Sequence, residues 1–131
     1  MSAFRKVTDR FAVSPQISVA DIVTAAAEGV TLVINNRPEG ESPDQPPGAV
    51  IEAAARQAGL DYVHIPVVGQ ASPAQVQQMQ AAVAGASGKV LAFCRSGTRS
   101  ITTWACGADA PRDTLLAQAR EAGYDLSGVL P

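Results

Sequence analysis

One short segment of the chain carries the side chains that could do chemistry. The segment FCRSGTRS, residues 93–100, places a cysteine, two arginines and a glycine together. A thiolate is a strong nucleophile, and an arginine guanidinium can hold an oxyanion through two parallel hydrogen bonds. Cys94 and Arg99 therefore predict a nucleophilic thiolate that faces an anionic substrate, and Ser100 could donate a hydrogen bond to the sulfur when it becomes a leaving group.

The loop around the cysteine is expected to bind an anion through its backbone. The apolar run KVLAF, residues 89–93, predicts a strand that ends just before Cys94, and a helix is expected to follow the loop. Amide groups at such a turn point inward and form a concave anion site, and the same dipoles favour the thiolate form of a cysteine. The residues predicted to form this anion-binding loop are Arg95, Ser96, Gly97 and Thr98.

A simpler interpretation is that Cys94 is a small buried core residue and that Arg95 and Arg99 are solvated. The preceding strand, the following helix, the internal glycine and the closing Arg-Ser pair together favour the nucleophile. Cys106 lies about two helical turns into the next predicted helix, where core packing is favoured over a role as a resolving cysteine.

The elements that must position this loop alternate along the chain as strand and helix signals. The predicted strands are 11–15, 30–36, 61–67 and 89–93, and the predicted helices are 18–29, 49–59, 72–85, 101–108 and 111–123. Such alternation predicts a three-layer α/β domain with a mostly parallel sheet of about four or five strands and helices on both faces. Ligands bind beyond the carboxyl ends of the strands in such sheets, which is where Cys94 lies.

The composition is that of one globular domain spanning residues 1–131. The chain is 47% apolar and 17% charged, with a net charge of −2, which gives no general attraction to nucleic acid or to a membrane surface. No apolar segment reaches the length of a membrane span or a secretory signal, and two cysteines suit a reducing cytoplasm. With one histidine and no cluster at ligand spacing, we expect neither a metal nor another cofactor.

Several segments together resemble a known family. The strings VINNRPEGE, YVHIPV, AGYDLSGVL and CRSGTRS resemble the phosphatase-like domain of the beta-lactamase hydrolase-like proteins, over roughly residues 5–130. That family is similar in fold to dual-specificity and tyrosine phosphatases. The resemblance implies a cysteine-dependent phosphatase acting on a small anionic or phosphorylated molecule. It assigns Cys94 as the nucleophile, Arg99 as the clamp on the phosphoryl oxygens and Ser100 as the hydroxyl that helps the sulfur to leave.

The sequence departs from the H-C-x5-R-[ST] motif of those phosphatases at three places. Only four residues separate Cys94 from Arg99, and Phe93 stands where the motif has histidine. The aspartate that protonates the leaving group in those enzymes is missing from VHIPVVGQAS, which offers Gly69 and Gln70 instead. Losing such an acid typically slows the cleavage of an unactivated ester about 10²–10⁴-fold.

These departures leave two further functions open. The string CRSGTRS also resembles the active-site loop of rhodanese sulfurtransferases, which often reads C-R-x-G-x-R-S. A shorter loop suits a sulfane sulfur carried on Cys94, and sulfur transfer needs no general acid because its leaving groups are already good. The third hypothesis is an anion-binding module that retains the loop but has no turnover.

The proline-rich loop at residues 37–48 could contribute to the same site, because it also leaves the carboxyl end of a predicted strand. Its acidic residues could replace the missing acid or could be solvated loop charges; they are Glu39, Glu41 and Asp44. Arg37 could add a second contact to the anion or could belong to a strand-ending turn. His64 is interpreted as a strand histidine with its hydrogen bonds satisfied, and Trp104 as a core residue.

Overall fold

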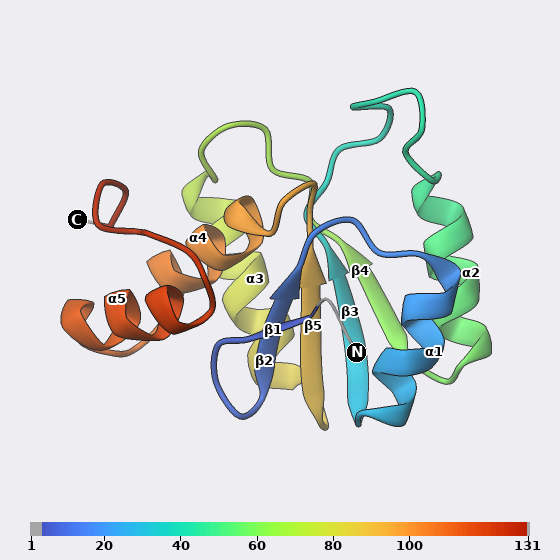
Figure 1. Ribbon diagram of the computed structural model, residues 1–131, viewed down its shortest axis with the longest axis horizontal. Coiled ribbons are helices and arrows are strands. Elements are labelled where there is room, and N and C mark those ends of the chain that lie inside the picture. Colours follow the sequence, from blue (N-terminus) through green and yellow to red (C-terminus); the bar gives the residue numbers. More distant parts are fainter. Residues whose placement is uncertain (1–3, 131) are drawn as a thin grey trace.

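The apolar segments of the chain assemble into one five-stranded sheet between two layers of helices, in a computed structural model that describes residues 4–130 (Figure 1). The strands are β1 (Arg5–Lys6), β2 (Phe11–Ser14), β3 (Val30–Asn35), β4 (Asp61–His64) and β5 (Lys89–Phe93). The helices are α1 (Val19–Ala27), α2 (Gly48–Gln57), α3 (Pro73–Gly85), α4 (Thr98–Gly107) and α5 (Arg112–Glu121). The predicted α/β class, with a mostly parallel sheet and helices on both faces, is confirmed.

The strand order β1-β2-β5-β3-β4 brings four strand ends to one edge of the sheet. Strands β2, β5, β3 and β4 pair in parallel, and β1 pairs antiparallel with β2. The register places Ser14 and Asn35 on either side of Phe93, and His64 beside Asn35. The segments that follow these four strands therefore leave the sheet at the same level (Figure 1).

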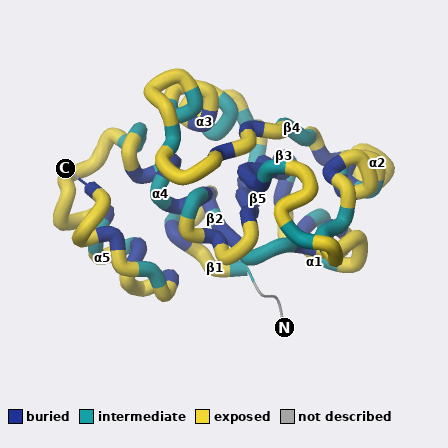
Figure 2. Tube along the Cα trace, turned by 90° about the horizontal axis from the view of Figure 1, so that it is seen from above, coloured by how far each residue is buried: buried dark blue, intermediate teal, exposed yellow. Residues whose placement is uncertain are grey.

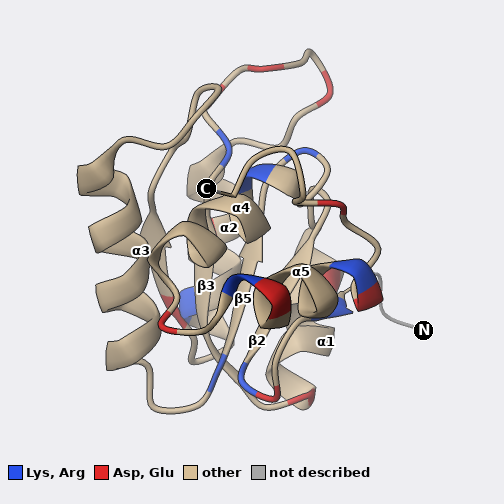
Figure 3. Ribbon diagram, turned by 90° about the vertical axis from the view of Figure 1, so that its left-hand side faces the viewer, with Lys and Arg blue, Asp and Glu red and all other residues tan. Residues whose placement is uncertain are grey.

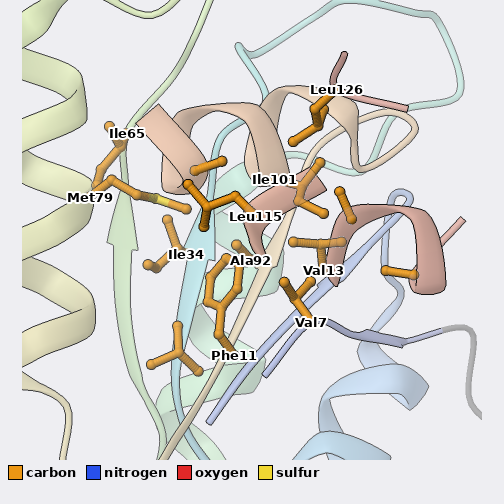
Figure 4. Packing of buried hydrophobic residues seen from close by; sticks show 14 of the residues in the cluster. Val7, Phe11, Val13, Ile34, Ile65, Met79, Ala92, Ile101, Leu115 and Leu126 are labelled. Carbon is orange, nitrogen blue, oxygen red and sulfur yellow. The ribbon is translucent and has the colours of Figure 1, made fainter. Parts of the chain in front are cut away.

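Each face of the sheet has its own apolar cluster, because successive strand residues point to opposite sides. Helices α3, α4 and α5 cover one face, where Met79, Ile101 and Leu115 pack against Ile34 and Ala92 (Figure 4). Helices α1 and α2 cover the other face; the buried residues there include Ile22, Ile51, Val33, Leu91 and Phe93. After the exposed Lys89, β5 is buried on both sides, which explains its apolar sequence from Val90 to Phe93.

Two of the predicted helix starts are confirmed in detail. Ser18 and Asp21 form a capping box at α1, and Ser72 and Gln75 form another at α3, where Pro73 occupies the first helical position. Each cap satisfies amide groups that the first turn would leave unpaired, a contribution of about 1 kcal/mol. Within residues 4–130, no helix has the length and apolar character that crossing a membrane requires.

Three elements differ from the prediction. β1 is a pair of exposed charged residues, Arg5–Lys6, and a two-residue strand of this kind has no apolar signal to detect. β4 ends at His64 rather than at residue 67, since Pro66 has no amide hydrogen to donate to the ladder. α4 begins at Thr98 rather than at residue 101, so Arg99 and Ser100 lie in its first turn.

Candidate active site

The candidate site lies where the loops that follow β3, β4 and β5 meet above the strand ends. Seen from above, buried strand ends are surrounded by loops that are largely exposed (Figure 2). The loops after β3 and β5 carry acidic and basic residues, whereas α3 carries no charged residue (Figure 3). The carboxyl edge of the sheet is therefore one of the charged parts of a molecule whose interior is largely apolar.

Cys94 lies at the bottom of this edge, directly after β5. The residue is 0% exposed, and its backbone amide donates to the carbonyl oxygen of Ser14 at 3.4 Å. Its Sγ atom accepts a hydrogen bond from the backbone amide of Gly97 at 3.1 Å. An amide directed at the sulfur stabilises negative charge there, so the turn predicted from the sequence is present and faces the thiol.

Gly97 gives the loop its shape. It is the N-cap of α4 and has a φ of 93°, a left-handed conformation that side chains other than glycine rarely adopt. A Cβ atom at this position would also overlap the hydroxyl of Tyr124. Both the backbone conformation and the space therefore require glycine here.

Tyr124 supports the loop from the C-terminal segment. Its hydroxyl donates to the carbonyl oxygen of Ser96 at 2.9 Å, and burial raises the pKa of this tyrosine. The phenol thus remains a neutral donor that fixes the orientation of one loop peptide. Tyr124 lies in the segment AGYDLSGVL, which contributed to the family resemblance, but no pattern in the sequence indicated this contact.

Arg99 extends from the first turn of α4 and is held by two neighbouring loops. Its Nη1 donates to Glu41 Oε2 at 2.7 Å and to the carbonyl oxygen of Val67 at 2.8 Å. Its Nη2 donates to Glu41 Oε1 at 2.8 Å, which completes a bidentate pair. The Glu41 carboxylate raises the pKa of Arg99, and the nearby Cys94 sulfur adds to that shift. The guanidinium is therefore fixed, fully charged, within electrostatic reach of the thiol.

Glu41 bridges two arginines and fixes both. Besides Arg99, it accepts a 3.0 Å hydrogen bond from Nε of Arg37, whose side chain is only 4% exposed. Arg37 also donates to Gln16 Oε1 at 3.0 Å and to Ser42 Oγ at 3.1 Å. Hydrogen bonds from Arg99 and then Arg37 lower the pKa of Glu41 from 4.5 to about 2. Glu41 is an anion at neutral pH, and it positions Arg99.

Glu41→Gln is expected to lower stability at neutral pH by about 1–2 kcal/mol, a value reduced for solvent screening because the Glu41 side chain is 26% exposed. Because the folded-state pKa is depressed, Glu41 contributes fully above about pH 4.5, and this contribution is lost as the pH falls toward about 2. The free energies of unfolding of the wild type and of the variant, measured with urea at a series of pH values, should converge as the pH falls from about 4.5 to about 2. Curves that stay parallel would contradict the ion pair.

A surface carboxylate provides the matched control for this prediction. Glu52 forms an i,i+4 pair with Arg56 in which the two side chains are 42% and 56% exposed. Glu52→Gln removes the same charge, but we expect its effect on the free energy of unfolding to stay within about 0.5 kcal/mol.

The other two acidic residues of the 37–48 loop do not contact Arg99. Both carboxylate oxygens of Glu39 accept from the Gly48 amide, at 2.9 and 3.0 Å, and so cap the start of α2. Asp44 accepts from Ser42 Oγ at 2.7 Å, and this hydrogen bond lowers its pKa. Of the three carboxylates predicted as substitute acids, the structure brings only Glu41 to the arginine, and it does so as an anion.

The remaining loop residues fall into two groups. Arg95, Ser96 and Thr98 are exposed at the rim, and the Ser96 and Thr98 hydroxyls lie 3.1 Å apart. Arg95 and Arg37 line a cavity of about 220 Å³ beside the loop. Ser100 is fully buried, and its Oγ atom has no hydrogen-bond partner within residues 4–130. Its predicted assistance to the departing sulfur stays a prediction.

The sequence favoured core packing for Cys106, and this prediction is wrong, because Cys106 is exposed. The adjacent Ala105 takes the buried position of α4, and a helix turns each following residue about 100° away from its predecessor. The Cys106 side chain lines a cavity of about 470 Å³ that Arg99 also lines, together with residues 69–71.

The interpretations of the two aromatic residues are consistent with their contacts. His64 has its Nε2 atom 2.9 Å from the Arg37 carbonyl oxygen, so this ring nitrogen is paired with the turn that follows β3. Trp104 is partly buried against the core and stacks on Phe11 with ring centroids 5.0 Å apart. Among the described residues, no three His, Cys, Asp or Glu side chains gather as metal ligands.

Comparison with known proteins relates this geometry to one family. Residues 3–110 match the family model described as "Beta-lactamase hydrolase-like protein, phosphatase-like domain". The beta-lactamase hydrolase-like protein of Xylella fastidiosa is 37% identical over 125 residues, which make up 92% of this chain and 29% of the relative. The chain therefore spans less than a third of the length of the curated relatives it matches.

Solved structures show the same fold. A proposed phosphatase from Neisseria meningitidis Z2491 superposes with a TM-score of 0.86 at 31% identity, covering 97% of this chain and 93% of that chain. PTPMT1 in complex with PI(5)P superposes with a TM-score of 0.73 at 16% identity, covering 91% and 83% of the two chains. At that identity the second likeness shows the fold alone.

Proposed function

This chain belongs to the family of the phosphatase-like domain of beta-lactamase hydrolase-like proteins, and from that premise we propose that it is a cysteine-dependent phosphatase. In this proposal residues 1–131 form a single phosphatase-like domain, and Cys94 is the nucleophile. One observation carries the proposal: the Gly97 amide donates to the Cys94 sulfur, while Glu41 fixes the Arg99 guanidinium beside it. The amide can stabilise a thiolate at Cys94, and the guanidinium can bind the negatively charged phosphoryl group that the thiolate attacks.

The chemistry proceeds in two displacements. A lone pair of the Cys94 thiolate forms an S–P bond, and the electron pair of the breaking P–O bond leaves with the ester oxygen. Arg99 and the loop amides hold the phosphoryl oxygens, where such donors stabilise the transition state most. Water then attacks phosphorus, the S–P bond breaks to restore the thiolate, and the proton from water leaves with inorganic phosphate. The buried Ser100 hydroxyl is available to donate to the sulfur as it departs.

The substrate is proposed to be a small anionic or phosphorylated molecule, and neither nucleic acid nor a membrane is proposed as a partner. Cys94 is 0% exposed, so the side chains that cover it must move before a substrate reaches its sulfur, which favours a small group over a bulky one. A terminal phosphoryl group is a small group of this kind. The bound PI(5)P of PTPMT1 is one phosphorylated ligand held by a protein of this fold.

A second candidate function is sulfur transfer, which the four-residue spacing between Cys94 and Arg99 favours. Cys94 would take a sulfane sulfur from thiosulfate, releasing sulfite, and would pass it to cyanide as thiocyanate. Anion binding without turnover is the remaining alternative.

Offering both kinds of donor distinguishes these functions. With p-nitrophenyl phosphate we expect continuous release of phosphate, and with thiosulfate and cyanide we expect no thiocyanate above the uncatalysed rate. Thiocyanate without phosphate would establish the sulfurtransferase instead. Saturable binding of phosphate, measured by calorimetry without either product, would leave the anion-binding module.

A further inference from the structure

We propose that this site acts on activated phosphates, namely aryl and acyl phosphates whose leaving group departs as a stable anion. The inference rests on the proposed phosphatase function and specifies its substrate class. It follows from the contacts and the charges of the groups around Cys94.

The carboxylate nearest the reacting atoms cannot supply a proton. Glu41 accepts three hydrogen bonds from Arg37 and Arg99, and both of its oxygens are occupied by guanidinium groups. Protonating Glu41 would break the contacts that hold Arg99. Glu41 therefore holds Arg99 in place, and it cannot act as the acid that protonates the leaving group.

The segment that follows β4 offers no acid either. The carbonyl oxygen of Val67 accepts from Arg99, which holds this segment close to the guanidinium. The next four residues are Val68, Gly69, Gln70 and Ala71, and none of them has a side chain that donates a proton at neutral pH. The segment after β4 therefore brings no acidic side chain to the guanidinium.

The outer acidic residues are engaged elsewhere. Glu39 caps α2, and Asp44 accepts from Ser42. Asp125, next to Tyr124, accepts from the amide and the hydroxyl of Ser127, and these hydrogen bonds lower its pKa. Each of these carboxylates accepts at least one hydrogen bond from a donor of the protein, and for Asp44 and Asp125 these bonds lower the pKa and so favour the ionised form.

Tyr124 and His64 also lie close to these loops, and each contacts a backbone oxygen of the protein. The hydroxyl of Tyr124 donates to the carbonyl oxygen of Ser96, and Nε2 of His64 contacts the carbonyl oxygen of Arg37. Within residues 4–130, the site therefore presents a nucleophile and an oxyanion clamp without a carboxylic acid that is free to protonate a leaving group.

The leaving group must then carry the negative charge itself. When the Cys94 sulfur forms its bond to phosphorus, the P–O electron pair stays on the departing oxygen, which leaves unprotonated as an aryloxide or a carboxylate. An alkoxide is far too basic to leave in this way, and the missing acid slows its departure about 10²–10⁴-fold. Phenols and carboxylic acids lose much less, because their anions are stable in water.

A leaving-group series tests this inference. We would measure kcat/KM with p-nitrophenyl phosphate, phenyl phosphate, acetyl phosphate and β-glycerophosphate. We expect a steep dependence, about tenfold for each unit of leaving-group pKa among the aryl esters, with acetyl phosphate cleaved rapidly. Cleavage of β-glycerophosphate within about tenfold of p-nitrophenyl phosphate would overturn the inference. If Cys94→Ser leaves all four rates unchanged, the proposed function fails, and the inference with it.

The same four substrates, measured with single variants, test whether one of the carboxylates acts as a general acid. The variants are Glu39→Gln, Glu41→Gln, Asp44→Asn and Asp125→Asn. We expect each variant to keep the wild-type slope, whatever its overall rate. The slope compares esters within one preparation, so a partly unfolded variant still gives a valid result. A variant that cleaves p-nitrophenyl phosphate normally but has a steeper slope would identify the acid and overturn the inference.

Discussion

Cys94→Ser is expected to abolish the release of phosphate from p-nitrophenyl phosphate, lowering kcat about 10⁴-fold or more. A serine hydroxyl at this position remains protonated, because one amide hydrogen bond from Gly97 cannot offset its weak acidity. The measurement is a steady-state assay at neutral pH, sensitive enough to detect the uncatalysed rate. A variant that keeps a tenth of the activity would contradict the role of the sulfur.

The second cysteine provides the matched control for this variant. Cys106 is exposed on α4 and undergoes the same change of one sulfur atom to oxygen. We expect Cys106→Ser to keep kcat within about twofold of the wild type, because surface substitutions rarely disturb the fold. Equal losses in both variants would indicate a general effect of cysteine removal instead of a nucleophile at position 94.

Arg99→Lys is expected to lower kcat/KM for p-nitrophenyl phosphate about 10²–10³-fold. The charge is kept, but an ammonium cannot span the two carboxylate oxygens of Glu41, the Val67 carbonyl oxygen and a phosphoryl group at once. The loss should therefore appear in kcat and KM together, and inorganic phosphate should inhibit the variant less strongly. A loss below about fivefold would show that the guanidinium geometry contributes little.

A distant arginine tests whether this loss is specific. Arg56 pairs with Glu52 on the exposed side of α2, and Arg56→Lys retains its charge. We expect this variant to have the wild-type kcat/KM, since a surface ion pair of this kind contributes little to stability.

The position of the proposed nucleophile could be predicted from the sequence because strand and helix signals flank it. After Lys89 the run KVLAF is apolar, which is typical of a strand buried on both faces, and β5 has those bounds. Gly97 indicated a backbone shape that a side chain would obstruct, and the structure gives this residue a φ of 93°. A sequence shows the periodicity of apolar residues and the positions that favour glycine. These two features were enough to predict that Cys94 lies between the end of a strand and a turn.

The partners of Arg99 could not be predicted, because they depend on how the loops fold onto one another. Residues 39–44 contain three carboxylates, and nothing in their order distinguishes Glu41, which reaches two arginines, from Glu39, which caps a helix. Tyr124 contacts Ser96 across 28 positions of the chain. The exposure of Cys106 depends on the phase of α4, which begins three residues earlier than its apolar pattern suggested.

The charged residues around the buried thiol of Cys94 have a physical explanation. Arg37 and Arg99 bring two positive charges to the strand ends, and Glu41 neutralises part of them while leaving the site cationic. An ion pair of this kind costs desolvation, so its value here is to fix a guanidinium at a defined place more than to stabilise the fold. An arginine fixed beforehand needs little reorganisation when the phosphoryl charge develops.

The most direct test of the central claim is to trap the intermediate on the sulfur. The protein would be mixed with p-nitrophenyl phosphate, quenched within the first turnovers and examined by intact-protein and peptide mass spectrometry, with thiosulfate offered in a parallel sample. We predict the mass of one phosphoryl group on the peptide that carries Cys94, and its absence in Cys94→Ser. A phosphoryl group on another residue, or a single added sulfur on Cys94 with no phosphoryl adduct, would contradict the account.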